Sequence, residues 1–366
     1  MSVSNVLLEV LREPALLPGL SEVRWDLLLR MARSERLLAR LESLLKQQDK
    51  WDEVPRRARD NIRGAMAHVE YLQLQVRREL MEVRKALRGL DAPLVLLKGA
   101  AYREVGLPCS AGRSLSDLDL LVRREDLPRI EQRLTDQGWA SDTEDDYDQQ
   151  YYREWMHEIP PLRHRFRGVE VDIHHNLLAL TGRYQVPAEK LWEQVRPLEE
   201  NLGVLAPADM LLHSAAHLLV SDELRGGLRD LYDIHQLYEH FQATEPDFPA
   251  VLLARSHELN LSRPLFYALH TAAELFHTPL SEELRNPGNF DLPNAAERKL
   301  MLHLIREVLR PRLPGESPPA FRQWLLYLRS HWIRMPPGLL LSHLARKSLR
   351  RFGGQSAEAP SGRREI

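Results

Sequence analysis

The sequence predicts an α+β protein, with a small mixed β-sheet that carries the functional residues and helical regions that flank it on both sides. Apolar residues recur at helical spacing before residue 90 and again from about residue 206, whereas short apolar runs separated by Gly, Pro and Asp lie between them. The expected divisions are a helical N-terminal region (1–90), a sheet core (91–200), a helical C-terminal region (201–353) and a disordered tail (354–366).

Helical segments are expected before the core. Pro14 and Pro18 end a first short helix, and the stretch 52–55 marks a break before a long helix from about Arg57 to Leu90. Mixed charges along that helix, as in RRELMEVRKALR, are typical of a solvated face with i,i+4 pairs.

The core begins where the helical spacing stops, near Asp91. The expected elements are a strand at 94–97 that turns into a helix at 100–105, a second strand within 116–122, a helix that ends at Gly138, a loop rich in Asp and Glu at 141–149, and a hairpin formed by 161–167 and 169–174.

Composition narrows the class of protein. A net charge of −2 with 28% charged residues argues against a uniformly basic chain that wraps nucleic acid, so no stable DNA binding is expected. The single cysteine, Cys109, can form neither an intramolecular disulfide nor a cysteine-rich zinc site, which favours a reducing, cytoplasmic location. The first residues lack a signal-peptide pattern, and no apolar run approaches the ~18 residues of a transmembrane helix.

Two aspartates in the second strand are the first candidates for catalysis. Asp117 and Asp119 point to the same face because side chains alternate along a strand, while Leu118 and Leu120 point to the core. Adjacent carboxylates repel one another unless a cation neutralises them. Hard oxygen ligands at this spacing suit Mg²⁺ or Mn²⁺.

The second strand of the hairpin repeats this alternation. Glu170, Asp172 and His174 share one face, so Asp172 supplies a third carboxylate if this strand lies beside the first. Three carboxylates on neighbouring strands are what a two-metal phosphoryl-transfer site requires. His174 is then placed to hydrogen-bond a carboxylate or the nucleotide, with a structural role as the alternative.

Candidates for phosphate binding precede the acidic strand. The turn at Lys98 and Gly99 offers a cation and backbone N–H groups, and the segment Gly112, Arg113, Ser114 brings a guanidinium close to the paired aspartates. The sequence leaves open which of the two segments holds a triphosphate.

The helical C-terminal region adds less specific candidates. His213 and His217 lie four apart, a spacing that can ligate zinc, but no third ligand accompanies them, so a core or capping role is favoured over a pocket role. Arg229 is a further pocket candidate. Asp230 and Asp233 are expected to pair with basic neighbours or to cap the pocket rather than to bind metal.

The order of these motifs resembles a known family. The runs LLKGAA, GRSLSDLDLLV and VEVDIHHNL, followed by LLHSAAHLLVSDELRGGLRDLYDIHQL, are similar to uncharacterised bacterial nucleotidyltransferases of the polymerase-β superfamily, over about residues 60–240. The resemblance implies Asp117 and Asp119 as metal ligands and Asp172 as the third carboxylate. Superfamily members usually carry a Gly-Ser pair shortly before the paired acids, whereas Lys98 and Gly99 lie farther upstream here.

These features predict a metal-dependent nucleotidyltransferase that moves NMP from an NTP to an RNA, protein or small-molecule acceptor. The alternative is a catalytically inactive nucleotide-binding or scaffold protein whose helical flanks make protein contacts. A basic amphipathic stretch at 332–352 is suited to weak contact with RNA or an anionic membrane, and the simpler interpretation is a terminal helix packed on the body.

Overall fold

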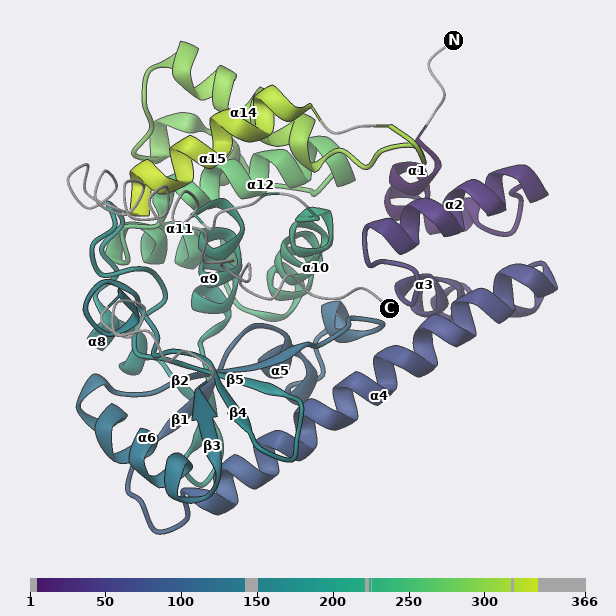
Figure 1. Cartoon of the computed structure of the whole chain (residues 1–366). Coiled ribbons are helices and arrows are strands. Elements are labelled where there is room, and N and C mark those ends of the chain that lie inside the picture. Colours follow the sequence, from purple (N-terminus) through teal and green to yellow (C-terminus); the bar gives the residue numbers. More distant parts are fainter. Residues whose placement is uncertain (1–4, 142–150, 221–223, 225, 317–318, 335–366) are drawn as a thin grey trace, which may run out of the picture.

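The computed structural model describes residues 5–141, 151–220, 224, 226–316 and 319–334. It confirms the predicted α+β class, because a seven-stranded mixed sheet is preceded and followed by helices (Figure 1). Nearly all of the expected acidic loop, the part of the basic stretch after Arg334 and the tail lie outside the described residues.

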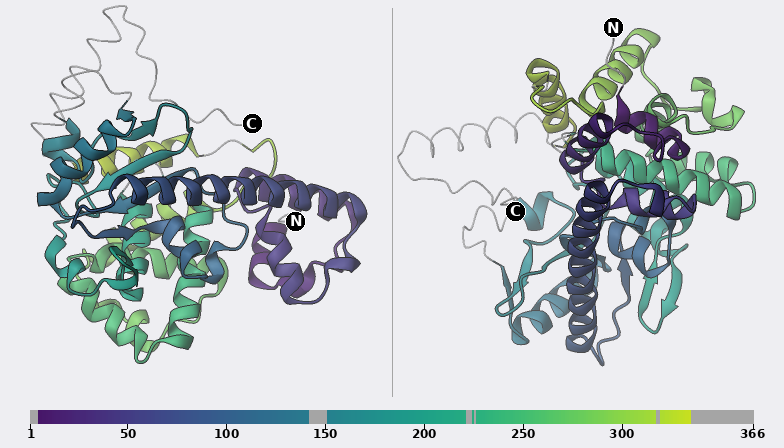
Figure 2. Two further views of the ribbon diagram at one scale, coloured as in Figure 1. Left: turned by 90° about the horizontal axis from the view of Figure 1, so that it is seen from below. Right: turned by 90° about the vertical axis from the view of Figure 1, so that its right-hand side faces the viewer.

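The N-terminal region is helical, as predicted. Its α-helices are α1 (Val6–Arg12), α2 (Glu22–Ser34), α3 (Arg40–Gln47) and α4 (Arg56–Ala86). The side chains of Asn5 and Ser21 cap α1 and α2 by accepting hydrogen bonds from backbone amides of their first turns. Helix α4 begins directly after Pro55 and crosses the molecule as one long rod (Figure 2).

The sheet has the strand order β3-β4-β5-β2-β1-β7-β6. The strands are β1 (Leu94–Leu96), β2 (Asp117–Leu121), β3 (Trp139–Ser141), β4 (Leu162–His164), β5 (Glu170–His174), β6 (Arg196–Glu199) and β7 (Leu202–Val204). Strand β2 runs parallel to β5, and β1 runs parallel to β7, whereas the other pairs are antiparallel. The helices α5 (Lys98–Glu104), α6 (Leu127–Asp136) and α8 (Ala188–Trp192) connect them.

The sheet is wider than the sequence predicted. The expected hairpin is confirmed, because β4 and β5 pair antiparallel with Leu162 opposite Val171. Strands β3, β6 and β7 were not predicted, since each is only three or four residues long and β6 is exposed and contains Pro197. Helix α5 begins at Lys98, two residues before the expected start at Ala100.

The two faces of the central strands differ in character. Helix α4 packs on β2, and α6 contacts both α4 and β3, so these helices cover the same face of the sheet. Leu118 and Leu120 are fully buried. By strand alternation, Asp117 and Asp119 lie on the face opposite these leucines.

The C-terminal region packs around one central helix. Its helices are α9 (Pro207–Val220), α10 (Leu228–Thr244), α11 (Phe248–Glu258), α12 (Ser262–Phe276), α13 (Glu282–Arg285), α14 (Ala295–Leu309) and α15 (Ala320–Arg334). Helix α9 is almost entirely buried and contacts α10, α11, α12 and α15. No helix of the described residues is long and apolar enough to cross a bilayer.

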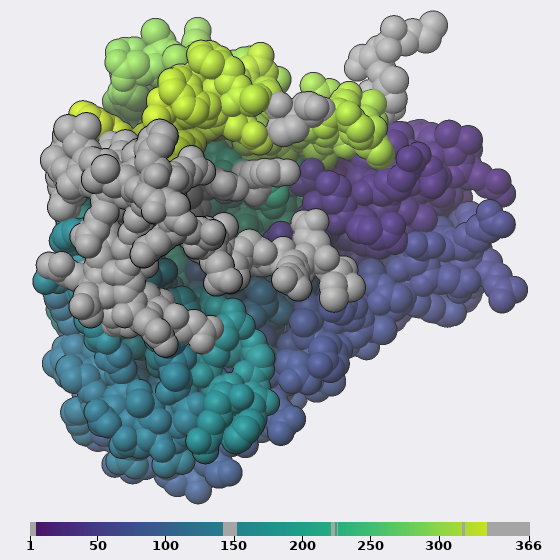
Figure 3. All heavy atoms as spheres, in the orientation of Figure 1, coloured from purple at the N-terminus to yellow at the C-terminus, as the bar shows by residue number. Residues whose placement is uncertain are grey.

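The N-terminal helices meet this C-terminal region directly. Asn5 donates a hydrogen bond to the carbonyl of Pro311 (2.7 Å), and Arg12 donates to the carbonyl of Leu275 (2.7 Å). Figure 3 shows the two regions in contact at the upper right of the molecule, above the surface of α4. The apolar core is accordingly continuous from α1 to α15.

Replacing Gly112 by Ala should destabilise the fold strongly. Gly112 has φ +66, and a Cβ there would lie 2.6 Å from the backbone nitrogen of Arg40, at the start of α3. A left-handed alanine costs roughly 1–2 kcal/mol, and overlap with rigid backbone adds about 1–3 kcal/mol. Gly106→Ala is the matched control, because Gly106 has φ +69 with nothing within 4 Å. Urea unfolding should show a clearly larger loss for Gly112→Ala, and equal losses would contradict this role.

Candidate functional site

The aspartates predicted to form the site come together on two paired strands. In the parallel register of β2 and β5, Asp119 lies opposite Asp172 and Asp117 lies opposite Glu170. Asp119 is buried, and the Oδ1 atom of Asp172 is buried without a hydrogen-bond partner. The structure therefore gathers three carboxylates on one face at the centre of the sheet.

Lys98 places a cation directly at these carboxylates. Its Nζ atom lies 2.8 Å from Oδ1 of Asp119, at the point where β1 turns into α5. The backbone of Lys98 is left-handed, with φ +45, which is uncommon for a residue other than glycine. Such strain is retained where the surrounding structure fixes a side chain in place. Burial opposes ionisation of Asp119, but Lys98 and His174 hold its pKa well below its usual range.

The pKa of Asp172 is shifted in the opposite direction from that of Asp119. Burial raises the pKa of its carboxyl group well above the usual value, and the negative charges of Asp119 and Glu158 raise it further. A carboxylate oxygen that has no hydrogen-bond partner and lies near other negative charges would be stabilised by a bound divalent cation. The residues present therefore fit a metal ion at this position.

Asp172→Asn should stabilise the protein when no metal is present. Because the folded-state pKa of Asp172 is raised, its contribution to stability is complete below about pH 4, the unfolded value, and is lost as pH rises through the folded value. The melting temperature of the variant in EDTA should accordingly exceed that of wild type at neutral pH, with a difference that shrinks toward pH 4. If the variant has a lower melting temperature than wild type at every pH, the carboxylate of Asp172 is not destabilised by its negative neighbours.

His174 connects Asp119 to an acid that the sequence did not indicate. Its Nε2 atom lies 2.9 Å from Oδ1 of Asp119, and its Nδ1 atom lies 3.3 Å from Oε2 of Glu158. His174 therefore hydrogen-bonds Asp119, one of the contacts expected of it, and its role in the site stays a prediction. Glu158 escaped prediction because it precedes Ile159 and Pro160 in a segment without alternation, and only its isolated bridge to His174 brings it to the sheet.

Helix α9 contributes the two histidines predicted as pocket candidates. Burial, followed by the ammonium of Lys98, lowers the pKa of His213 well below its usual value, so this ring is neutral. His217 is exposed, and its pKa is also lowered by Lys98. The rings lie 6.4 Å apart, centroid to centroid. Helix α9 contacts α5, which begins at Lys98, so both histidines come from a helix next to the site.

The second phosphate-binding candidate is held in a separate ion network. Arg113 donates from Nε to Oδ2 of Asp233 (2.7 Å), and Arg40 donates from Nη2 to Oδ1 of the same aspartate (2.7 Å). A Cβ at Gly99 would lie 2.2 Å from Nη1 of Arg113, so glycine at 99 makes room for this guanidinium. The structure thus brings Lys98 to the acids and turns Arg113 toward Asp233 on α10.

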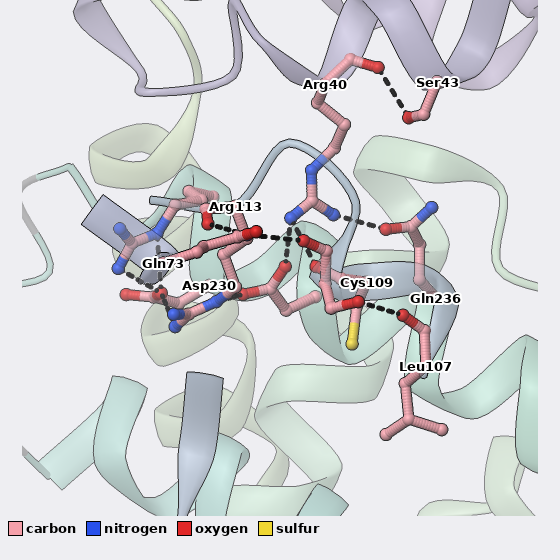
Figure 4. Close-up of polar contacts among 11 residues, drawn as sticks. Arg40, Ser43, Gln73, Leu107, Cys109, Arg113, Asp230 and Gln236 are labelled. Atoms are coloured by element: carbon pink, nitrogen blue, oxygen red, sulfur yellow. Dashed lines mark hydrogen bonds and ion pairs between the residues drawn. The ribbon is translucent and has the colours of Figure 1, made fainter. Parts of the chain in front are cut away.

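This network joins distant parts of the chain, as Figure 4 shows. Arg40 on α3 also donates to the carbonyl of Cys109 (2.8 Å), and Gln73 on α4 donates to the carbonyl of Arg113 (2.8 Å). Cys109 itself is a buried free thiol. The network therefore fixes the segment before β2 against α3, α4 and α10.

The remaining predicted residues lie beside the three carboxylates or beside the ion network of Arg113 and Asp233. Arg229 forms hydrogen bonds to Asp230, and Asp230 also lies 3.6 Å from Arg113. The expectation that Asp230 and Asp233 pair with basic neighbours is confirmed. Glu170 pairs with Arg163 on the neighbouring strand β4. Ser114 is half-buried between Arg113 and the start of β2.

Carboxylates on central strands, with a lysine beside them, are typical of proteins that transfer phosphoryl or nucleotidyl groups. Residues 21–277 match the family described as Uncharacterised nucleotidyltransferase, and the protein belongs to that family. No curated protein matches the sequence. Among solved structures, the chain is similar to the crystal structure of JHP933 from Helicobacter pylori, with 17% sequence identity, a TM-score of 0.30, and coverage of 65% of this chain and 93% of that chain.

Proposed function

We propose that the protein is a metal-dependent nucleotidyltransferase of the polymerase-β type, which transfers NMP from an NTP to a hydroxyl or amine acceptor. The observation that carries this proposal is the register of β2 and β5, with Asp119 opposite Asp172 and the Oδ1 atom of Asp172 buried without a partner. Mg²⁺ or Mn²⁺, held by Asp117, Asp119 and Asp172, would neutralise the charge that develops on the triphosphate.

The side chains of the site have separate roles in this reaction. A new bond forms between the acceptor atom and the α-phosphorus, the bond from that phosphorus to the bridging oxygen breaks, and pyrophosphate leaves. Asp172 accepts the proton of the acceptor, because its Oδ1 atom lies in the site without a hydrogen-bond partner. Lys98 offers its ammonium to the triphosphate, and His174 holds the carboxylate of Asp119 in position.

A catalytically inactive nucleotide-binding or scaffold protein is the second candidate. It is favoured by one observation, that Lys98 and His174 both contact the same oxygen of Asp119. An internal cation at this oxygen neutralises part of the charge that would otherwise attract metal. In that case, the protein would bind a nucleotide without transferring it.

The two candidates are separated by a labelling experiment. The full-length protein is incubated with each α-labelled NTP, with Mg²⁺ or Mn²⁺, and with RNA, protein and small-molecule fractions of a cell lysate. We expect label in one fraction together with release of pyrophosphate, and no label with Asp117→Asn. A rise in melting temperature with NTP and metal but no labelled product favours the inactive protein. Absence of both effects contradicts a nucleotide site.

A further inference from the structure

A second group of ligand atoms lies on the other side of His174 from Asp119. It consists of His157, Glu158 and His174, each of which offers one nitrogen or oxygen atom, and these atoms all lie within 4.8 Å of one another. The chain brings them together because Glu158 forms a β-bridge with His174, and His157 directly precedes Glu158. The group lies beside the three aspartates without including any of them.

The spacing of these atoms suits a small transition-metal ion. Nδ1 of His174 lies 3.3 Å from Oε2 of Glu158, and Nε2 of His157 lies 3.9 Å from the same oxygen. The rings of His157 and His174 lie 5.2 Å apart with an angle of 33° between their planes. A tetrahedral ion with bonds of about 2.0–2.1 Å separates its ligands by roughly 3.3 Å, so only a small shift of His157 is needed.

The hydrogen bonding of His174 leaves one of its nitrogens directed into this group. Its Nε2 atom faces the carboxylate of Asp119, which only accepts hydrogen bonds, so the tautomer with a proton on Nε2 is the one favoured when Nδ1 binds an ion. The Nδ1 atom is buried and has no hydrogen-bond partner, although Glu158 is near, and the whole side chain is only 2% exposed. A histidine that donates to a carboxylate through one nitrogen and presents the other to a ligand has the arrangement common at metal sites.

We propose that His157, Glu158 and His174 bind a transition-metal ion of the zinc class. This site is separate from the site formed by the three aspartates. Two imidazoles and one carboxylate are a donor set of zinc sites that keep an open position, whereas Mg²⁺ prefers oxygen ligands throughout. Burial lowers the pKa of His157 well below its usual value, so its ring is neutral, as a metal ligand must be. The inference does not depend on nucleotidyl transfer.

The carboxylate of Asp119 gives this site a connection to the first one. An ion at Nδ1 of His174 would fix the ring and its tautomer, and the same ring holds Asp119 through Nε2. Asp119 is thus a positioning residue for the proposed ion, while Lys98 on the other side of that carboxylate balances its charge.

Cobalt binding tests the proposal without an activity assay. The full-length protein is stripped of metal with EDTA and dialysed into excess Mg²⁺, which fills the three-aspartate site. Co²⁺ is then added while its visible absorption is followed. We expect one equivalent to bind with the bands of a nitrogen- and oxygen-ligated ion, and Zn²⁺ to abolish them. His157→Asn and Glu158→Gln should each weaken binding by more than about tenfold, since even residues that only support a ligand cost 10–100-fold. His68→Ala is the matched control, because His68 is an exposed histidine on α4 outside this group, and it should bind as wild type does.

Three outcomes would overturn the site. The first is that the wild-type protein binds no more Co²⁺ than a protein that lacks such a site. The second is that neither His157→Asn nor Glu158→Gln weakens the binding of Co²⁺. Because those variants can lose their fold, X-ray absorption of the zinc-loaded wild type gives an independent measurement. Two imidazoles among its ligands support the assignment, and their absence contradicts it.

Discussion

Nucleotidyl transfer should fall by on the order of 10²- to 10³-fold or more when Asp117 is replaced by Asn, the loss found when one electrostatic stabiliser is removed from an active site. The amide keeps the shape of the side chain but removes its negative charge from the proposed ligand set. Asp117 is only half-buried, so the fold should survive the change. Initial rates at saturating NTP and Mg²⁺, with circular dichroism of the same samples, check both parts of the prediction.

Glu170→Gln is the matched control for that variant. Glu170 lies opposite Asp117 on β5 and pairs with Arg163, so its replacement removes a neighbouring charge without touching the three aspartates. Transfer by Glu170→Gln should stay within about tenfold of wild type, because this half-exposed charge pair is partly screened by solvent. Equal losses in both variants would mean that net charge, rather than a specific ligand, accounts for the effect.

The acids of the site were predictable because strand alternation is a local signal. A period of two put Asp117 and Asp119 on one face, and the same period grouped Asp172 with His174. The structure adds the register that brings Asp119 and Asp172 opposite each other, which depends on two strands that are parallel and separated by about fifty residues of chain. Local sequence patterns carry no information on such a register. The sequence could therefore predict that Asp172 joins Asp117 and Asp119 only on the condition that the two strands are neighbours.

The roles of Gly99, Gly112 and Arg113 could not be predicted from the neighbouring sequence. Gly99 and Gly112 belonged to two alternative phosphate-binding segments, the second of which contains Arg113. The structure shows that both glycines permit close packing, Gly99 against Arg113 and Gly112 against the start of α3. This packing depends on Asp233, which lies more than a hundred residues later in the sequence. A buried arginine and a phosphate-binding arginine have the same sequence signature until their partners are known.

Asp233→Asn should destabilise the protein by about 3–5 kcal/mol, the cost of leaving a buried ion pair without one partner. The side chain of Asp233 is 1% exposed, and its carboxylate binds both Arg40 and Arg113, whose side chains are 1% and 10% exposed. The amide cannot compensate two buried guanidinium groups. Urea unfolding of the variant and of Glu245→Gln provides the comparison, because the Arg196–Glu245 pair is exposed and should contribute about 0–1 kcal/mol.

The same change should also weaken nucleotide binding, through the contact between Arg113 and Gly99. With its aspartate gone, Arg113 is no longer held against the turn that carries Lys98, and the ammonium that faces Asp119 loses its fixed position. At a low temperature, where the variant is fully folded, its KM for NTP should rise several-fold while Glu245→Gln keeps the wild-type value. If Asp233→Asn loses stability but keeps the wild-type KM, the network stabilises the fold alone and Lys98 is positioned by β1 and its own strained backbone.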